Sequence, residues 1–180
     1  MTWDDEGYYD FSFAIDKSRR YHALMRDFNQ GVFNYITGWN AFAASGAFFS
    51  IIGGFPWIGA GLAGVVALAS LFDSIFRYET RAREHHDLCA RFTRLAKRIA
   101  ITEPTPENLA KLRAERLEIE ADEKSCKRLI DLMAQNGEAR ARGVPEARLV
   151  PLSKWQCRLG YMFTFGLRRL EEAKARREAR

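Results

Sequence analysis

A chain of 180 residues with a formal net charge of +5 has room for one domain, or for one small domain with an appendage. Its three cysteines are odd in number and show neither CxxC nor Cys/His metal spacing, which argues against a disulfide framework and favours a reducing compartment. No P-loop, dinucleotide fingerprint, nucleophile elbow or zinc spacing is present. We therefore expect no enzyme, with no catalytic residue, no metal and no cofactor.

Residues 1–31 open the chain. The first ten are acidic and aromatic, whereas a secretory signal peptide has a basic start followed by an apolar run. Basic residues then appear at Lys17, Arg19, Arg20 and Arg26. We expect an N-terminal cytoplasmic segment that includes a juxtamembrane helix, without a cleavable signal.

The next stretch, residues 28–72, contains no Asp, Glu, Lys, Arg or His over 45 positions. A membrane-spanning helix needs about 20 mainly apolar residues, so this gap holds two spans and a turn. We place the spans at residues 32–52 and 57–76, with Gly53, Gly54 and Pro56 between them. The sequence predicts an all-α membrane protein with a two-helix transmembrane hairpin over residues 32–76.

Basic residues flank the hairpin but are absent from its turn. Those after the second span are Arg77, Arg81, Arg83, Arg91, Arg94, Lys97 and Arg98. Cytoplasmic flanks of membrane spans are enriched in Lys and Arg, so we expect both termini in the cytoplasm.

A water-soluble helical bundle with this apolar hairpin at its centre is the alternative. Asn34, Thr37, Asn40, Ser45 and Ser50 weaken the first span as a lipid-facing helix. However, a chain of this length has too little remaining mass to cover two helices that are apolar all round. We favour the membrane interpretation.

Polar or small side chains of the first span recur at steps of three or four, and so share one helix face. They are Gln30, Asn34, Thr37, Ala41 and Ser45. Either this polar stripe lines a central path in a homo-oligomer, or it packs against the second span of the same chain. As a pore lining it carries no charged ring, which predicts a poorly selective hole.

Small residues at four-residue steps mark the second span. They are Gly59, Ala63 and Ala67, with Ala60 and Gly64 beside them. Such spacing lets helix backbones approach closely in lipid, which favours association of identical copies.

Residues 77–137 are expected to form a cytoplasmic antiparallel helical hairpin. No Gly or Pro occurs between Phe76 and Pro104, so the second span should continue without a break. Its packed positions are predicted to be Leu88, Phe92, Leu95 and Ile99. The following helix should begin after Thr105 as N-cap, with Pro106 as first residue, and end near Asn136, with Gly137 just past its end. Its stripe has seven-residue spacing and is typical of a coiled coil: Leu112, Ile119, Cys126 and Met133.

Residues 138–180 are expected to be a linker and a basic amphipathic C-terminal helix. The linker, residues 138–151, is polar and contains Gly143, Pro145 and Pro151. From Ser153 onward the chain has eight basic and three acidic residues, with Trp155 and Phe163 among them. Such a helix either lies flat on an anionic membrane or docks on the helical hairpin, and both interpretations stay open.

The adjacent pair His85 and His86 is the only conspicuous polar constellation. Neighbouring residues on a helix point about 100° apart, so these two cannot bind one metal together, and we expect a solvated or packed pair. The positive charge lies beside the spans and in the tail, so phospholipid headgroups explain it better than nucleic acid.

Residues 18–143 resemble the SLATT superfamily, two-transmembrane domains of bacterial conflict systems. The resemblance rests on the basic entry at Ser18, Arg19 and Arg20, on the uncharged hairpin, and on two helical motifs. The first motif is Arg83, His86, Leu88, Phe92 and Leu95, and the second is residues 117–123 followed by Leu129, Asn136 and Gly143. Many members have Pro after the acidic pair, where this chain has Lys124 and Ser125.

The resemblance implies an effector of antiviral, abortive-infection defence that oligomerises and perforates or depolarises the inner membrane. It also implies a partner encoded nearby that senses infection or produces a nucleotide signal. Our interpretation is such an effector, with the lipid bilayer and further copies of the chain as its partners. The alternatives are a non-perforating membrane anchor that recruits a soluble protein through residues 88–133, and a soluble helical interaction protein.

Overall fold

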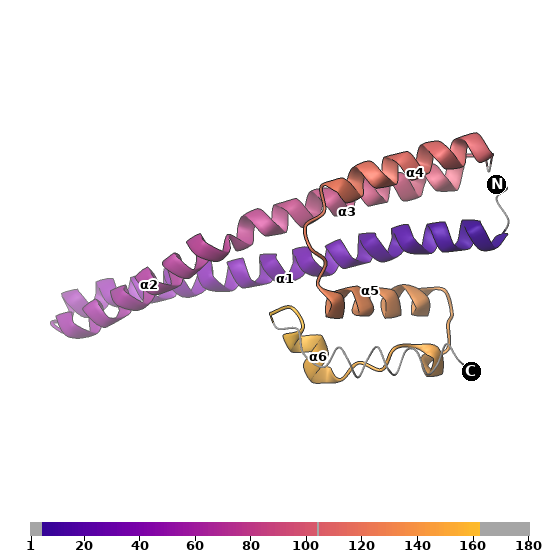
Figure 1. Ribbon diagram of the computed structural model, residues 1–180. Coiled ribbons are helices and arrows are strands. Elements are labelled where there is room, and N and C mark those ends of the chain that lie inside the picture. Colours follow the sequence, from indigo (N-terminus) through magenta and orange to yellow (C-terminus); the bar gives the residue numbers. More distant parts are fainter. Residues whose placement is uncertain (1–4, 104, 163–180) are drawn as a thin grey trace. The chain divides into compact units, whose positions relative to one another are not determined.

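The computed structural model describes residues 5–103 and 105–162, and all regular structure in this part of the chain is helical (Figure 1). This confirms the predicted all-α class. The elements are α1 (Asp5–Ile52), α2 (Pro56–Phe76), α3 (Tyr78–Ile101), α4 (Pro106–Ala121), α5 (Arg128–Ala141), the short 3₁₀ helix η1 (Glu146–Arg148) and α6 (Lys154–Leu159).

The chain forms two compact units. The charged unit comprises Met1–Met25 and His85–Arg180, and the hairpin unit comprises Arg26–Glu84. Helix α1 contributes to both, because it runs for 48 residues without interruption. The juxtamembrane helix and the first span, which we expected to meet at residues 31 and 32, therefore form one continuous helix.

Helices α2 and α3 are separated by a single residue, Arg77. Its φ of 51° and ψ of 50° are left-handed, and its N–H donates to the Asp73 carbonyl. The prediction of an unbroken helix past Phe76 is therefore wrong. Left-handed backbone costs a non-glycine residue roughly 1–2 kcal/mol, so it is rarely expected at an arginine. Helix breaks are usually marked by Gly or Pro, and neither stands near residue 77.

The core of the charged unit lies where α1, α3 and α4 meet. The predicted α3 stripe is buried there together with residues of the other two helices: Phe11, Ile15, Leu88, Phe92, Leu95, Ile99, Leu109, Leu112 and Ile119. Ion pairs join Arg91 to Asp122 and Arg98 to Glu115. Because the partner number falls as the α3 number rises, α3 and α4 run antiparallel. Thr105 caps α4 as predicted, accepting from the Asn108 N–H at 3.2 Å.

The predicted helix from Pro106 to Asn136 is two helices, with a linker at residues 122–127. Cys126, expected on the packed stripe, is exposed in this linker, and Met133 is half-buried on α5. Gly137 lies inside α5 rather than past its end, and a Cβ there would come 2.7 Å from Arg20 Cδ. The Arg20 side chain of α1 therefore lies directly over the α5 backbone at this glycine.

Residues 138–151 are packed at both ends, whereas most positions between them are exposed, so the expected polar linker is anchored rather than free. Glu138 is only 4% exposed and forms ion pairs with Arg20 and Arg142. Leu149 and Val150 are buried as well. The segment returns along α5 because these contacts hold it there.

The start of the C-terminal segment docks on α5. Ser153 and Gln156 form a capping box at the start of α6. At Gly160 a Cβ would lie 3.2 Å from Leu129 Cβ, and Leu152 packs with Leu129 and Leu132. The rest of the predicted amphipathic helix, residues 163–180, lies outside the described residues.

Candidate membrane-inserting hairpin

Helices α1 and α2 of the hairpin unit are joined by a three-residue turn. Gly54 has φ +84°, a conformation that glycine adopts without steric cost, and Pro56 is the first residue of α2. The Phe55 N–H donates to the Ser50 carbonyl at 2.8 Å. The turn that the Gly-Gly-Phe-Pro sequence predicted is therefore present, and it returns the chain along α1 (Figure 1).

The inner face of this hairpin is made of small side chains. Ala43, Ala47 and Gly59 are buried. A Cβ on Gly59 would come 2.9 Å from Ile51 Cγ1 and 3.0 Å from the Ala47 carbonyl oxygen. On Gly46 it would come 3.1 Å from Leu62 Cδ1. The two backbones approach closely because these positions carry little or no side chain.

One polar contact crosses the inner face: Asn40 Nδ2 donates to Ser70 Oγ at 3.2 Å. Two buried oxygens on this unit, Asn40 Oδ1 and Asp73 Oδ1, have no hydrogen-bond partner among the described residues. Sequence reasoning left Asn40 outside the polar stripe and singled out neither Ser70 nor Asp73. The available signal was helical spacing: Asn40 precedes the small residues Ala43 and Ala47 by three and seven positions, which places it on the same face of α1.

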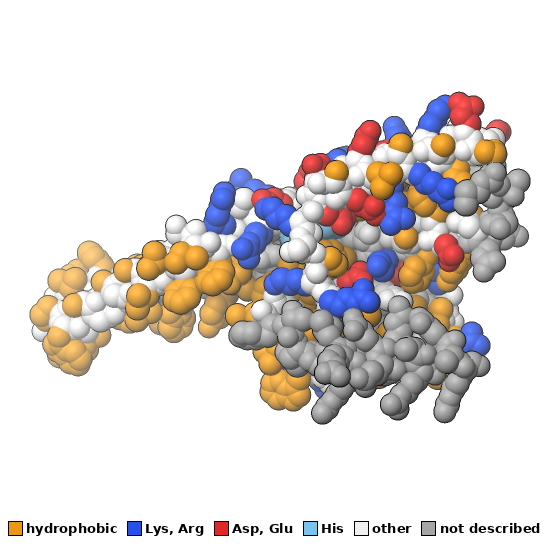
Figure 2. Space-filling model, in the orientation of Figure 1, with side chains coloured by type: hydrophobic (Ala, Val, Ile, Leu, Met, Phe, Trp, Pro, Cys, Tyr) orange, Lys and Arg blue, Asp and Glu red, His pale blue; other side chains and the backbone are white. Residues whose placement is uncertain are grey.

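The outer face of the hairpin is apolar and exposed. Tyr35 is 75% exposed and Trp57 73%, and the same surface holds exposed Phe42, Phe48, Phe49, Ile51, Ile52, Phe55, Leu68, Leu71, Phe72 and Ile75. Figure 2 shows hydrophobic side chains over this part of the molecule, while Lys, Arg, Asp and Glu gather on the charged unit. Soluble monomers rarely expose contiguous apolar patches beyond about 300–600 Å². Such a surface marks a site for a membrane or for another protein.

Within the described residues, one helical stretch is long and apolar enough to cross a membrane. It is Pro56–Ile101, and only 6% of its most apolar 18-residue window is buried within the protein. The apolar half of α1 does not meet the same criterion, because polar residues such as Asn34 and Asn40 lie within it. The composition therefore identifies α2 as the stronger span.

The predicted polar stripe lies on the exposed surface of α1. Gln30, Asn34, Thr37, Ala41 and Ser45 are all exposed, whereas Ala43 and Ala47 face α2. Gln30 Nε2 donates to Asn34 Oδ1 at 2.8 Å, and Ser45 Oγ donates to the Ala41 carbonyl at 2.9 Å. The stripe does not pack against the second helix of its own hairpin.

The small residues of α2 divide between its two faces. Gly59 alone is buried against α1, while Ala60, Ala63, Gly64 and Ala67 are exposed. A Cβ on Gly64 would meet nothing within 4 Å. The hairpin therefore leaves four of the five small positions on its outer surface.

A second group that sequence reasoning missed is a buried histidine cluster in the charged unit. His22 is 2% exposed, with Nε2 2.9 Å from Glu123 Oε1 and Nδ1 2.9 Å from His85 Nδ1. Its ring stacks on Phe92 at 5.6 Å between centroids. The predicted histidine pair is split, since His85 is half-buried in this cluster and His86 is exposed. The available signal was that His22 follows the buried Ile15 by seven residues, on the same face of α1.

The cluster is a hydrogen-bond network. In the tautomer in which His22 Nε2–H donates to Glu123, His22 Nδ1 is an acceptor for the Nδ1–H of His85. Tyr21 lies beside it and accepts from the Lys127 N–H at 3.0 Å. Burial raises the pKa of the Tyr21 phenol well above its ordinary value. No group of His, Cys, Asp and Glu among the described residues has the arrangement of a metal site.

The described residues thus define an all-helical protein with one helix able to span a membrane. No family model matches the chain, and no curated protein or solved structure matches it either.

Proposed function

We propose that this protein is a membrane effector whose hairpin inserts into the bilayer, oligomerises and perforates it. One observation carries the proposal: the α1–α2 hairpin presents apolar side chains outward and keeps its polar stripe away from its own partner helix. An apolar exterior is stable in lipid, and the helical backbone satisfies its own hydrogen bonds there.

Both helices insert together in this proposal. Helix α2 is the stronger span, and the three-residue turn leaves the apolar half of α1 no room to remain outside once α2 crosses. Lys and Arg flank the hairpin on both sides and are absent from its turn, which favours cytoplasmic termini. The bacterial inner membrane is what the SLATT resemblance implies.

Association of identical copies then gives the polar stripe a role. The stripe is costly on a lipid-facing surface, because buried polar groups need hydrogen-bond partners. In a ring of hairpins it faces a shared aqueous path, while Ala60, Ala63, Gly64 and Ala67 allow neighbouring helices to approach. The lining carries no charge, so the path passes ions with little selectivity.

The biological setting in this proposal rests on the SLATT resemblance. It is antiviral, abortive-infection defence, in which a sensor or nucleotide-signal-producing partner encoded nearby triggers the effector. No nucleic acid is bound directly. The charged unit provides the surface for that partner.

A non-perforating anchor is the second candidate. It is favoured by the charged unit, which has its own buried core and exposes Ile101 and Leu117 as contacts for a soluble protein. An anchor inserts the same hairpin but leaves the bilayer sealed.

Dye-filled liposomes separate these functions. The wild-type protein is expected to pellet with the liposomes and release the dye. The double variant Asn34→Leu/Thr37→Leu is expected to pellet equally well and release little, because its stripe is no longer polar. Phe42→Leu, on the exposed surface outside the stripe, is the matched control and should leak like wild type.

Each contrary outcome rejects one step. Undiminished leakage by the double variant rejects the stripe as a pore lining. Membrane binding by the wild-type protein without leakage supports the anchor. A protein that stays in the supernatant excludes both membrane functions.

A further inference from the structure

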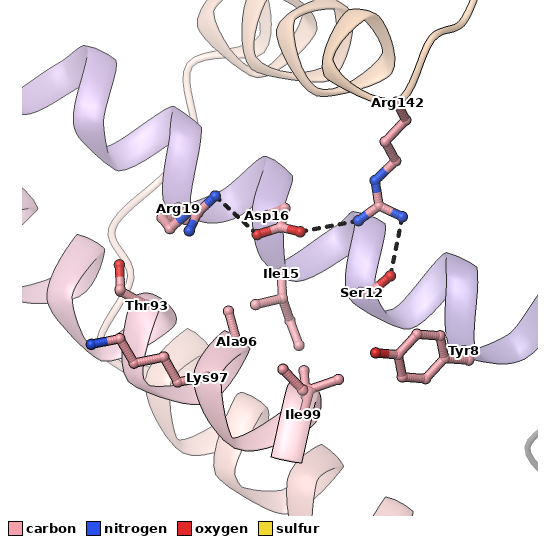
Figure 3. Close-up of a pocket in the computed structure, with 11 residues that line it drawn as sticks. Tyr8, Ser12, Ile15, Asp16, Arg19, Thr93, Ala96, Lys97, Ile99 and Arg142 are labelled. Atoms are coloured by element: carbon pink, nitrogen blue, oxygen red, sulfur yellow. Dashed lines mark hydrogen bonds and ion pairs between the residues drawn. The ribbon is translucent and has the colours of Figure 1, made fainter. Parts of the chain in front are cut away.

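A pocket of about 460 Å³ lies in the charged unit, between the N-terminal part of α1 and the C-terminal half of α3 (Figure 3). Its size falls within the 300–1,000 Å³ typical of small-molecule sites. Four of its lining residues carry a charge: Asp16, Arg19, Lys97 and Arg142. Three positive charges and one negative charge leave a net charge of +2.

The single carboxylate of the pocket is already paired. Asp16 accepts from Arg142 Nη2 at 3.0 Å and pairs with Arg19 Nη2 at 3.2 Å. Arg142 also binds Ser12 and Glu138 and lies over the Tyr9 ring. Figure 3 shows Arg19, Asp16, Arg142 and Ser12 linked in a row. Arg142 therefore holds Asp16 in place, and the positive excess rests with Arg19 and Lys97.

Both of these cations have hydrogen-bonding capacity to spare. Lys97 makes no hydrogen bond or ion pair with any described residue, although it lines the pocket. Arg19 uses Nη2 on Asp16, which leaves the other N–H groups of its planar fork. A guanidinium fork with a nearby ammonium is a favourable pair for a phosphate group.

The rest of the pocket combines the hydroxyl groups of Ser12 and Thr93 with an apolar part. Ile15 and Ile99 are buried beneath it, and Ala96 and the ring of Tyr8 complete its walls. A free inorganic ion would leave this apolar surface unused. The combination suits a ligand that carries a phosphate at one end and an apolar or flat group at the other.

We propose that this pocket binds a small organic phosphate, with Arg19 and Lys97 on the phosphate and Tyr8 and Ala96 against the apolar part. The phosphate belongs either to a soluble molecule of mononucleotide size or to a phospholipid headgroup. The site is separate from the hairpin, and the proposal does not depend on perforation.

Calorimetric titration of the full chain in an uncharged detergent tests it. The probes are AMP, adenosine, inorganic phosphate and dihexanoyl phosphatidic acid, which is a short lipid soluble as a monomer. We expect AMP or the short lipid to bind, inorganic phosphate to bind more weakly, and adenosine to fail. AMP binding alone assigns a soluble ligand, and lipid binding alone assigns a headgroup.

Substitution identifies the residues. Lys97→Ala should weaken binding by about tenfold or more, as expected for loss of a charge-assisted hydrogen bond. Lys111→Ala, an exposed lysine on α4 outside the pocket, is the control and should bind like wild type. Circular dichroism should show equal helix content in both. The proposal is overturned if no phosphate probe binds, if adenosine binds as tightly as AMP, or if Lys97→Ala binds like wild type.

Discussion

His22 Nε2 lies 2.9 Å from Oε1 of Glu123, and this contact ties α1 to the linker that separates α4 from α5. The other ring nitrogen of His22 meets His85 on α3. A single imidazole thus joins three segments of the charged unit that are far apart in sequence. Since the imidazole is buried, each lost partner leaves a polar atom without compensation.

Glu123→Ala should therefore lower the free energy of unfolding of the charged unit by about 1–3 kcal/mol. Urea unfolding of the detergent-solubilised chain, followed by circular dichroism, measures this. Glu118→Ala is the control, because that side chain is exposed on α4. Equal losses in the two variants would show that the contact with His22 contributes nothing specific.

The buried phenol of Tyr21 should make the free energy of unfolding fall at alkaline pH. Burial raises the pKa of its phenol above the ordinary value of 10.0, so the folded chain holds the neutral form where the unfolded chain ionises. This contribution to stability is complete below pH 10 and falls as the pH rises above it. Tyr21→Phe should lose about 1 kcal/mol at pH 7, through the unpaired Lys127 N–H, and should be less sensitive to alkali than wild type.

Urea unfolding at pH 8 and pH 11 tests the sign. The control is Tyr9→Phe, whose ring is exposed at the surface. Equal alkaline losses in wild type and Tyr21→Phe would refute the role of this phenol.

Local signals predicted the elements that need no distant partner. The apolar spacing of Leu88 and Phe92 predicted the packed face of α3, and Thr105 with Pro106 predicted the start of α4. The two glycines before Phe55 predicted the turn of the hairpin. In each case the cause lies within a few residues of its effect.

Two helix breaks have causes that sequence spacing does not contain. The α4–α5 linker is held by His22 and Tyr21, more than one hundred positions earlier in the chain. Arg77 takes a left-handed conformation with no glycine to mark it. The polar stripe could be predicted because it needs only helix periodicity, whereas the histidine cluster and the phosphate pocket require α1 and α3 to meet.

The side chain of Asn136 should stabilise residues 138–151, the segment that we expected to be a polar linker. Its side chain is 5% exposed, donates to the Val150 carbonyl at 2.7 Å and accepts from the Val150 N–H at 3.0 Å. Asn136→Ala leaves both backbone groups unpaired and should cost about 2–4 kcal/mol in urea unfolding. Asn108→Ala, which removes an exposed bond to the Glu103 carbonyl, should cost less than 1 kcal/mol by comparison. A small loss at Asn136 would mean that water replaces these bonds.

Leucine substitutions at Gly59 and at Gly64 should distinguish packing within one hairpin from packing between copies of the chain. Leucine at Gly59 would drive into the Ala47 carbonyl and Ile51, so Gly59→Leu should lower the melting temperature in detergent. Gly64 faces open space in a single copy, so Gly64→Leu should leave that temperature unchanged. If exposed small residues mediate association, Gly64→Leu should instead reduce the oligomer size seen by chemical cross-linking and light scattering. An intact oligomer in Gly64→Leu would remove Gly64 from the proposed contact between copies, because leucine there is too bulky for two helices to approach closely.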